Sequence, residues 1–225
     1  ADDVTLNTCK AICSGDKINA CDGDTVSTTA VTCASYLGFD GQNGRAVCTA
    51  EGDDCKVECD QGNVFVDGKC VHGYLETFDF VGETTLSNTN RDASYAAGSF
   101  RSASSGLTWT YTNARNALCG NYAIDGNGIM FKGGTLATTA PGGMKELTLQ
   151  TTRGTTGDGE RLLKVEISSA SNPSVGGSCM PVREYYYSSV INMPACNIEI
   201  DGDVKITVTA EGDQINVDNI RWLSK

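Results

Sequence analysis

Cysteines are distributed so unevenly that they divide the chain. Of the eleven in 225 residues, only Cys119, Cys179 and Cys196 lie beyond position 70. The eight early ones are Cys9, Cys13, Cys21, Cys33, Cys48, Cys55, Cys59 and Cys70. Eight cysteines in so short a segment indicate either zinc ligands or a disulfide framework. The change in density predicts a small module over residues 1–72 and a larger domain over residues 73–225.

The spacing of the early cysteines favours disulfides over zinc. Only Cys9/Cys13 and Cys55/Cys59 are spaced like zinc knuckles, and the single histidine, His72, lies outside the group. Apolar runs in this segment are short and are broken by Gly and Asp turns, so cross-links worth about 2–4 kcal/mol each must supply stability. We expect all eight cysteines to pair among themselves, with the connectivity left open.

Disulfides place the chain in an oxidising compartment, so we expect a secreted or cell-surface protein. The start Ala1-Asp2-Asp3 is typical of a chain freed of its signal peptide, and no apolar run is long enough to span a bilayer. The absence of an Asn-x-Ser/Thr acceptor mildly favours a bacterial source. A net charge of −11 argues against nucleic acid as a partner, because phosphate binding needs clustered Lys and Arg.

From Tyr74 onward the sequence follows a strand pattern. In the stretch 107–112, Leu107, Trp109 and Tyr111 share one face, and three threonines share the other. The predicted strands are Leu75–Phe80, Tyr95–Arg101, Leu107–Thr112, Tyr122–Phe131, Met144–Thr152, Arg161–Ser168, Val182–Ile191, Val204–Thr209 and Ile215–Leu223. This number and spacing of strands predict an all-β fold, a β-sandwich or jelly roll, preceded by a small disulfide-rich module.

Two details of these strands can be tested. Alternation predicts that Leu147, Leu149, Leu163, Val165, Ile167, Val204, Ile206 and Val208 point inward. In the last strand the apolar residues change phase between Val217 and Ile220, which requires one extra residue. We therefore predict a β-bulge at Asp218-Asn219.

Five blocks carry a resemblance to a known family. They are Glu76-Thr-Phe-Asp79, Gly98-Ser-Phe100, residues 106–115, residues 122–130 and Val217-Asp-Asn-Ile-Arg-Trp222. Residues 74–223 resemble the β-sandwich accessory domain of secreted bacterial nucleases, phosphatases and other surface hydrolases, whose plan is similar to the jelly roll of carbohydrate-binding modules. The early module lies outside this resemblance, although residues 59–70 resemble the disulfide-closed last hairpin of small extracellular cysteine-rich modules.

The resemblance implies a structural calcium ion where the first and last strands meet. Glu76, Asp79 and Asp218 are the matching carboxylates, and calcium accepts such oxygens together with backbone carbonyls. The alternative is that Asp218 and Asn219 only stabilise the bulge through local hydrogen bonds.

Aromatic and polar residues supply candidates for ligand binding. Trp109 could stack on a sugar ring, although its phase with Leu107 favours the core. Asn113 and Arg115, which we expect in a loop, are better candidates for bonding to hydroxyls. Alternation in Tyr185, Tyr186 and Tyr187 exposes at least one ring, either as a binding platform or as a cover for the sandwich edge.

Among the later cysteines, three cannot all pair. Cys179 and Cys196 flank the tyrosine run and would anchor this insertion, so we expect them to form a disulfide. Cys119 is then a free thiol. The rival pairing joins Cys119 to either of the two.

The sequence contains little that indicates catalysis. A single histidine makes a Ser-His-Asp arrangement implausible, and no Gly-rich phosphate loop precedes a helix. The favoured hypothesis is a secreted, non-catalytic protein that binds a glycan or surface polysaccharide. The alternative is an extracellular structural or adhesion protein that uses residues 1–72 for protein–protein interaction, and a polysaccharide-degrading enzyme ranks third.

Overall fold

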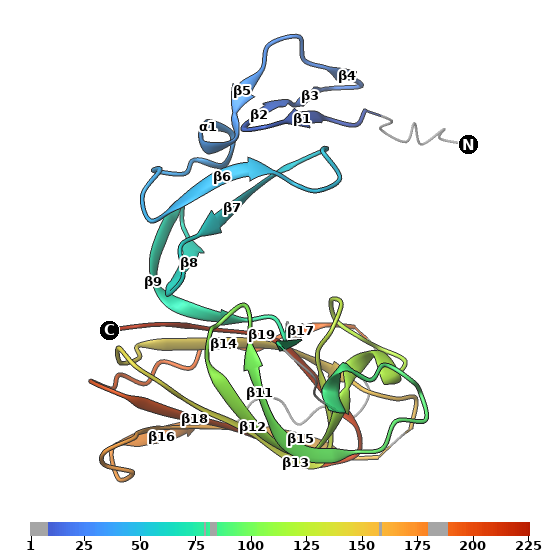
Figure 1. The fold of residues 1–225 in the computed structure, drawn as a ribbon, viewed down its shortest axis with the longest axis vertical. Coiled ribbons are helices and arrows are strands. Elements are labelled where there is room, and N and C mark those ends of the chain that lie inside the picture. The colour runs from blue at the N-terminus through green and yellow to red at the C-terminus, as the bar shows by residue number, and fades with distance from the viewer. Residues whose placement is uncertain (1–8, 79, 82–84, 158, 180–188) are drawn as a thin grey trace. The chain divides into compact units, whose positions relative to one another are not determined.

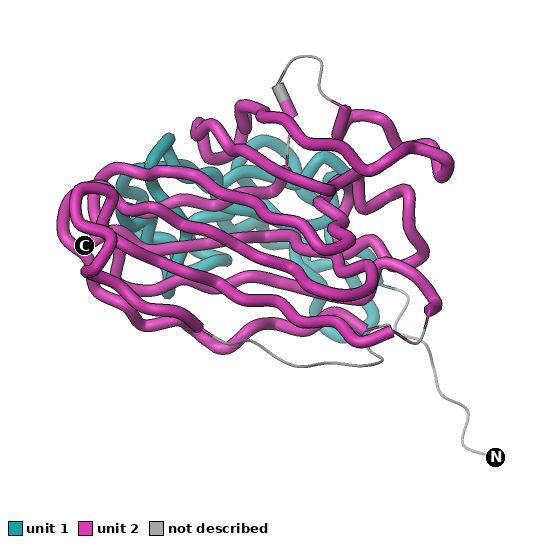
Figure 2. The backbone as a smooth tube through the Cα atoms, turned by 90° about the horizontal axis from the view of Figure 1, so that it is seen from below, with its two compact units in different colours: residues 1–72 teal, residues 73–225 magenta. Residues whose placement is uncertain are grey.

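A computed structural model gives the fold of the chain (Figure 1). It describes residues 9–78, 80–81, 85–157, 159–179 and 189–225. The chain forms two compact units, residues 1–72 and residues 73–225 (Figure 2). The prediction of an all-β fold with a disulfide-rich first module is confirmed.

The first unit consists of short strands and one helical turn. Its elements are β1 (Ile12–Ser14), β2 (Lys17–Asn19), β3 (Cys21–Asp22), β4 (Thr25–Val26), β5 (Val31–Thr32), α1 (Cys33–Leu37), β6 (Gly44–Cys48), β7 (Cys55–Cys59), β8 (Asn63–Val66) and the first half of β9 (Lys69–Glu76). Helix α1 begins after Thr32, whose hydroxyl accepts a hydrogen bond from the backbone N–H of Ser35. It ends at Gly38, which adopts the left-handed conformation common at helix C-termini.

Four disulfides hold this unit together. They are Cys9–Cys21, Cys13–Cys48, Cys33–Cys55 and Cys59–Cys70. The buried core consists of Ile18 and three half-cystines, so cross-links replace much of the apolar packing. The predicted last hairpin is confirmed, because β8 and β9 pair around the Asp67-Gly68 turn and Cys59–Cys70 closes it.

The second unit is a sandwich of two sheets. Its strands are the second half of β9, β10 (Phe80–Val81), β11 (Ala96–Ser102), β12 (Thr108–Asn116), β13 (Ile129–Ala140), β14 (Glu146–Arg153), β15 (Arg161–Ser169), β16 (Gly176–Cys179), β17 (Ile191–Asn192), β18 (Val204–Gly212) and β19 (Ile215–Leu223). Two short 3-10 helices, Thr85–Ser87 and Ala117–Cys119, lie between strands.

Strand β13 belongs to both sheets. In the larger sheet, with order β10-β11-β12-β13-β18-β15-β16, residues 135–140 of β13 pair with β18. In the smaller sheet β19 lies between β9 and β14, and β17 pairs with β14. Residues 129–131 of β13 pair with β19, so one strand joins the two layers (Figure 1).

Apolar residues that alternate along the strands fill the space between the sheets. All eight residues predicted to point inward are buried, with exposures of 0–1%. At the centre, Trp109 and Trp222 meet edge to face with ring centroids 6.1 Å apart, and Tyr74 stacks on Trp222 at 5.0 Å. Such aromatic pairs add stability beyond the area that they bury.

The predicted bulge in β19 is confirmed. Between Arg221 and Asp218 this strand has one residue more than its partner β14, and Asn219 takes a φ of 47°. A second bulge lies in β12, which has one residue more than β11 between Tyr111 and Ala114, and Asn113 there also has a φ of 47°. Asparagine tolerates this left-handed conformation better than most residues do.

Three strand predictions are wrong in part. Arg115 lies within β12 and not in a loop, because the strand continues past the Asn113 bulge and pairs with residues 129–131. Residues 122–128 form no strand and include bends at 124–127, so the Asp125-Gly126 and Asn127-Gly128 dipeptides delay the strand to Ile129. The segment predicted over residues 75–80 is interrupted after Glu76, and most of the strand predicted over residues 182–191 lies outside the described residues.

Candidate functional site

The outer face of the larger sheet carries a regular array of threonines. Along β12 the outward residues are Thr108, Thr110 and Thr112, which alternate with buried Trp109 and Tyr111. On β13 and β18 outward residues likewise alternate with buried ones. We call nine of the outward residues of these strands the threonine grid: Thr108, Thr110, Thr112, Thr135, Ala137, Thr139, Lys205, Thr207 and Thr209.

Strand register aligns the grid in rows. Thr112 lies opposite Thr135, which lies opposite Thr209. Ala137 lies between Thr110 and Thr207 in the next row. Neighbouring strands are about 4.8 Å apart and outward residues on one strand are about 6.7 Å apart, so hydroxyl and methyl groups repeat regularly across the face.

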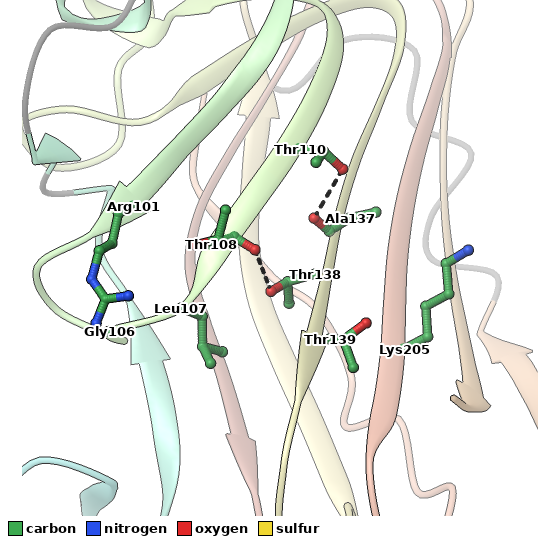
Figure 3. Close-up of a pocket in the computed structure, with 9 residues that line it drawn as sticks. All are labelled: Arg101, Gly106, Leu107, Thr108, Thr110, Ala137, Thr138, Thr139 and Lys205. Carbon is green, nitrogen blue, oxygen red and sulfur yellow. Dashed lines mark hydrogen bonds between the residues drawn. The ribbon is translucent and has the colours of Figure 1, made fainter. Parts of the chain in front are cut away.

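A shallow depression of about 500 Å³ lies at one edge of the grid (Figure 3). Its floor includes Thr108, Thr110, Thr138 and Thr139, and Arg101 of β11 and Lys205 of β18 lie on opposite sides of it. The hydroxyl of Thr138 donates to the Thr108 carbonyl at 2.8 Å, which ties β12 to β13 beneath the surface. The nine described residues around the depression include two cations and no acid.

A second depression of about 400 Å³ lies across β18, β15 and β16 and also includes Lys205. Its lining adds the hydroxyls of Ser168, Ser178 and Thr207 and the carboxylate of Glu166. Lys164 Nζ donates to Glu166 Oε1 at 2.8 Å, so that negative charge is already paired. Together the two depressions offer an open, hydroxyl-lined face rather than a deep cleft.

Trp109 is not a ligand-binding residue, and its prediction as one is wrong. Its side chain is completely buried, and its indole Nε1 donates to Ser105 Oγ at 3.4 Å within the core. No sugar ring can reach a face of this indole. The physical reason is the one that its phase with Leu107 already indicated, since apolar alternation marks the buried side of a strand.

Asn113 and Arg115 lie outside the depression. Asn113 is exposed, and its amide Nδ2 donates to the carbonyls of Lys132 and Gly133, so the side chain holds the β13 bulge. The Arg115 guanidinium donates to the carbonyls of Arg91 and Ala93 at 3.1 and 3.0 Å and stacks on Tyr95 at 4.6 Å. Both predicted ligand residues therefore have structural partners. Tyr185, Tyr186 and Tyr187 lie outside the described residues.

The residues predicted to bind calcium are buried carboxylates at the junction of the first and last strands. Glu76 lies opposite Ile220 in the β9–β19 pair. Its oxygens accept hydrogen bonds from Ser105 Oγ at 2.8 Å, Ser102 Oγ at 3.0 Å and the Phe78 backbone N–H at 2.6 Å. Burial raises the pKa of Glu76, against the lowering effect of these donors. Asp79 lies outside the described residues.

Asp218 occupies the β19 bulge and is 2% exposed. Its carboxylate accepts from the backbone N–H groups of Asn219 at 2.7 Å and Asp125 at 3.3 Å. The pKa of Asp218 is raised to about 7, mainly by burial and in smaller part by the charges of Asp125 and Glu76. Within the described residues no Lys or Arg forms an ion pair with Asp218 or Glu76. These oxygens are of the kind that calcium prefers, and two buried carboxylates would gain from a nearby cation.

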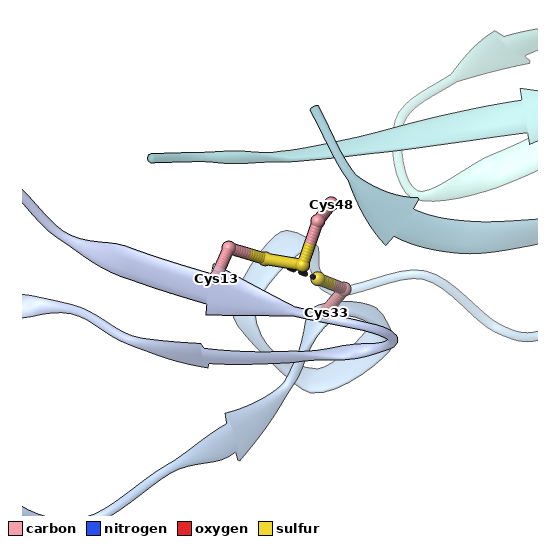
Figure 4. Close-up of side chains that lie close together, drawn as sticks. All are labelled: Cys13, Cys33 and Cys48. Carbon is pink, nitrogen blue, oxygen red and sulfur yellow. Dashed lines mark hydrogen bonds between the residues drawn. A yellow bond between two sulfur atoms is a disulfide. The ribbon is translucent and has the colours of Figure 1, made fainter. Parts of the chain in front are cut away.

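Sulfur atoms of Cys13, Cys33 and Cys48 lie within 4.8 Å of one another (Figure 4). All three belong to disulfides, because Cys13 pairs with Cys48 and Cys33 pairs with Cys55. The group is therefore two adjacent cross-links. In the second unit Cys179 pairs with Cys196, and Cys119 is a buried free thiol that donates to the Asn88 carbonyl at 3.3 Å.

No protein-family model matches the chain, and no curated protein sequence matches it. Solved structures to which it is similar include CsCBM6-3 from Clostridium stercorarium in complex with cellobiose, at 14% identity and a TM-score of 0.33 over 50% of this chain and 83% of that one. TmCBM61 in complex with β-1,4-galactotriose has 14% identity and a TM-score of 0.36, over 65% and 99%. A family 11 module from Clostridium thermocellum in complex with a mixed-linked tetrasaccharide has 13% identity and a TM-score of 0.31, over 68% and 96%.

Across the described part of the chain, no helix combines the length and the apolar character that crossing a bilayer requires.

Proposed function

We propose that this chain is a secreted, non-catalytic protein that binds polysaccharide through the threonine grid of the larger sheet. The observation that carries the proposal is the open depression across β11, β12, β13 and β18, lined by hydroxyls and two cations. Hydroxyl groups donate and accept, so they match the alternating donors and acceptors of a sugar chain. The resemblance of residues 74–223 to accessory domains of surface hydrolases supports the same role.

The shape of the face suits a polymer better than a small molecule. Pockets for small ligands are concave and cover most of the ligand surface. Here the surface is shallow and extends over several strands, and the described residues that line it include no aromatic ring. An extended chain could lie across such a face and contact several rows of the grid at once.

The experiment is a pull-down with insoluble polysaccharides and a glycan array, using the double variant Thr110→Val/Thr139→Val. Valine keeps the branched shape and strand preference of threonine but removes the hydroxyl. The control is Thr148→Val on β14, an outward residue of the other sheet whose side chain forms no hydrogen bond to the described residues. We expect binding by the natural protein and the control, and about tenfold weaker binding by the double variant if each lost hydrogen bond is worth about 0.5–1.5 kcal/mol. Equal binding by all three proteins would exclude the grid.

We also propose that calcium stabilises the sandwich by binding near Glu76 and Asp218. Carboxylate oxygens from the two strands, with Asp79 as a further candidate ligand, would hold the ion and join the ends of the unit. The support is the burial of Glu76 and Asp218 without a cationic side chain to pair with them. This role concerns stability and is independent of the grid.

A protein partner for the first unit is the second candidate function. In the first unit Ile12 is 59% exposed, Tyr36 is 46% exposed and Val31 is 39% exposed. These side chains remain at the surface even though the buried core of the unit contains few apolar residues. Exposed apolar side chains are common at protein–protein interfaces. Cross-linking of the full chain on its source cells, followed by mapping of adducts within residues 9–72, tests this function separately from glycan binding.

A further inference from the structure

We infer that the polysaccharide bound by the threonine grid is anionic, and that Arg101 and Lys205 bind its carboxylate or sulfate groups. The inference rests on the proposed function and specifies the class of ligand. Both cations line the same depression, and both side chains are exposed. Among the described residues the side chain of neither forms a hydrogen bond or an ion pair.

The positions of the two cations suit a repeating chain of charges. Arg101 lies opposite Thr108, and Lys205 lies opposite Thr139. Trp109 pairs with Thr138, and the next position of the same antiparallel register sets Thr108 beside Thr139, so the four residues follow one row across four strands. Three strand spacings separate the backbones of the cations by about 14 Å. An extended oligosaccharide lying along this row would meet a cation at each end and threonine hydroxyls between them.

The net negative charge of the whole chain does not prevent an anionic polysaccharide from binding at this row. The net charge is −11, but at physiological salt charges beyond about 8 Å are largely screened, so the groups nearest the ligand dominate. The nearest acid in the adjoining depression is Glu166, whose charge is paired with Lys164. Arginine binds carboxylate and sulfate groups with two parallel hydrogen bonds, and lysine contributes a point charge.

The test compares three polysaccharides of matched length: a polyuronate, a sulfated glycan and a neutral glucan. Affinity of the full chain is measured at 0.05 M and 0.5 M salt. We expect tighter binding to an anionic chain than to the neutral one, with a loss of about tenfold at the higher salt. Comparison of the polyuronate with the sulfated glycan shows whether carboxylate or sulfate groups are bound more tightly. Equal binding to neutral and anionic chains would overturn the inference and leave the proposed function intact, whereas binding to none would contradict both.

The decisive variant is Arg101→Gln/Lys205→Gln, with Arg91→Gln/Lys145→Gln as the control. The control removes two exposed cations of the same unit that lie outside both depressions, so the net charge changes equally. We expect the first pair of substitutions to weaken anionic binding about tenfold and to remove most of its salt dependence. The control should bind like the natural protein. An equal loss in both variants would show that overall charge, and not this row, governs binding. Equal affinity for single-stranded DNA would also overturn the inference, because any polyanion would then suffice.

Discussion

The indole of Trp109 meets the indole of Trp222 edge to face, with ring centroids 6.1 Å apart and both side chains completely buried. This contact joins β12 of the larger sheet to β19 of the smaller one. A residue that looked like a sugar-stacking platform is thus part of the sandwich core.

Trp109→Ala should therefore destabilise the fold. Loss of a buried tryptophan leaves a large cavity and costs about 3–5 kcal/mol. Trp109→Phe should cost less and should leave polysaccharide binding unchanged. Chemical denaturation measures both effects. If Trp109→Phe kept its stability but lost binding, the ring would have to reach the ligand after all.

Calcium should stabilise the protein. The raised pKa of Asp218 determines in which direction the stability of the calcium-free protein changes with pH. Its folded pKa of about 7 exceeds the unfolded value of 3.8, so between these values the folded state holds more protons. Without calcium, stability therefore falls as the pH rises from about 4 to about 7, and the penalty remains in full above that range. Calcium binds the ionised form and should offset the penalty at neutral pH.

The variant Asp218→Asn distinguishes calcium binding from a role of Asp218 in stabilising the bulge alone. In EDTA at pH 7.5 the variant should melt a few degrees above the natural protein, and the difference should shrink at pH 5. With calcium the order should reverse, because only the natural protein gains a bound ion. Asp92→Asn, which changes an exposed acid of the same unit, is the control. A variant that melts lower in EDTA at both pH values, in a protein that ignores calcium, would favour the bulge-stabilising role alone.

Thiol labelling should find a single reactive cysteine. Cys119 is 4% exposed, and burial raises the pKa of its thiol, so the native protein should react slowly. After unfolding without reductant, we expect one labelled thiol per chain, at Cys119. Peptide mapping by mass spectrometry identifies it. An adduct on Cys179 or Cys196 would contradict the disulfide between them.

Asn113 should act through the backbone and not through the ligand. Asn113→Gly keeps the left-handed φ accessible, whereas Asn113→Ala adds a conformational cost of roughly 1–2 kcal/mol. Both lose the side-chain bonds to the carbonyls of β13. We expect Asn113→Ala to unfold more readily than Asn113→Gly, with equal polysaccharide binding. A binding loss in both variants without a stability difference would restore its role as a ligand residue.

The features that could be predicted from the sequence are those that depend on a pattern within one strand. Alternation with period two is visible within one strand, so it indicated the buried faces, the change of phase at Asp218 and the threonines at positions 108, 110 and 112. It could not show that Arg115 continues a strand, since that depends on pairing with Met130 across the Asn113 bulge. Nor could it give the pairing of eight cysteines, which the path of the chain decides.

The candidate binding surface could not be predicted without knowing the order in which the strands pair. Arg101 and Lys205 are far apart in the sequence, and neither stands in a motif that marks a site. They share a row only because β18 crosses back to pair with β13, while β11 pairs with β12 on the other side. The threonine alternation was the available signal, and its extension to β13 and β18 becomes visible once those strands are in register.

The central strand of the grid is also the strand common to both sheets. A polymer held on this face would pull on β13, which hydrogen-bonds to β12 and β18 in one layer and to β19 in the other. Tension on the ligand is then shared among the hydrogen-bond ladders of both layers. A load on a bound polymer would thus pass from one layer of the sandwich into the other.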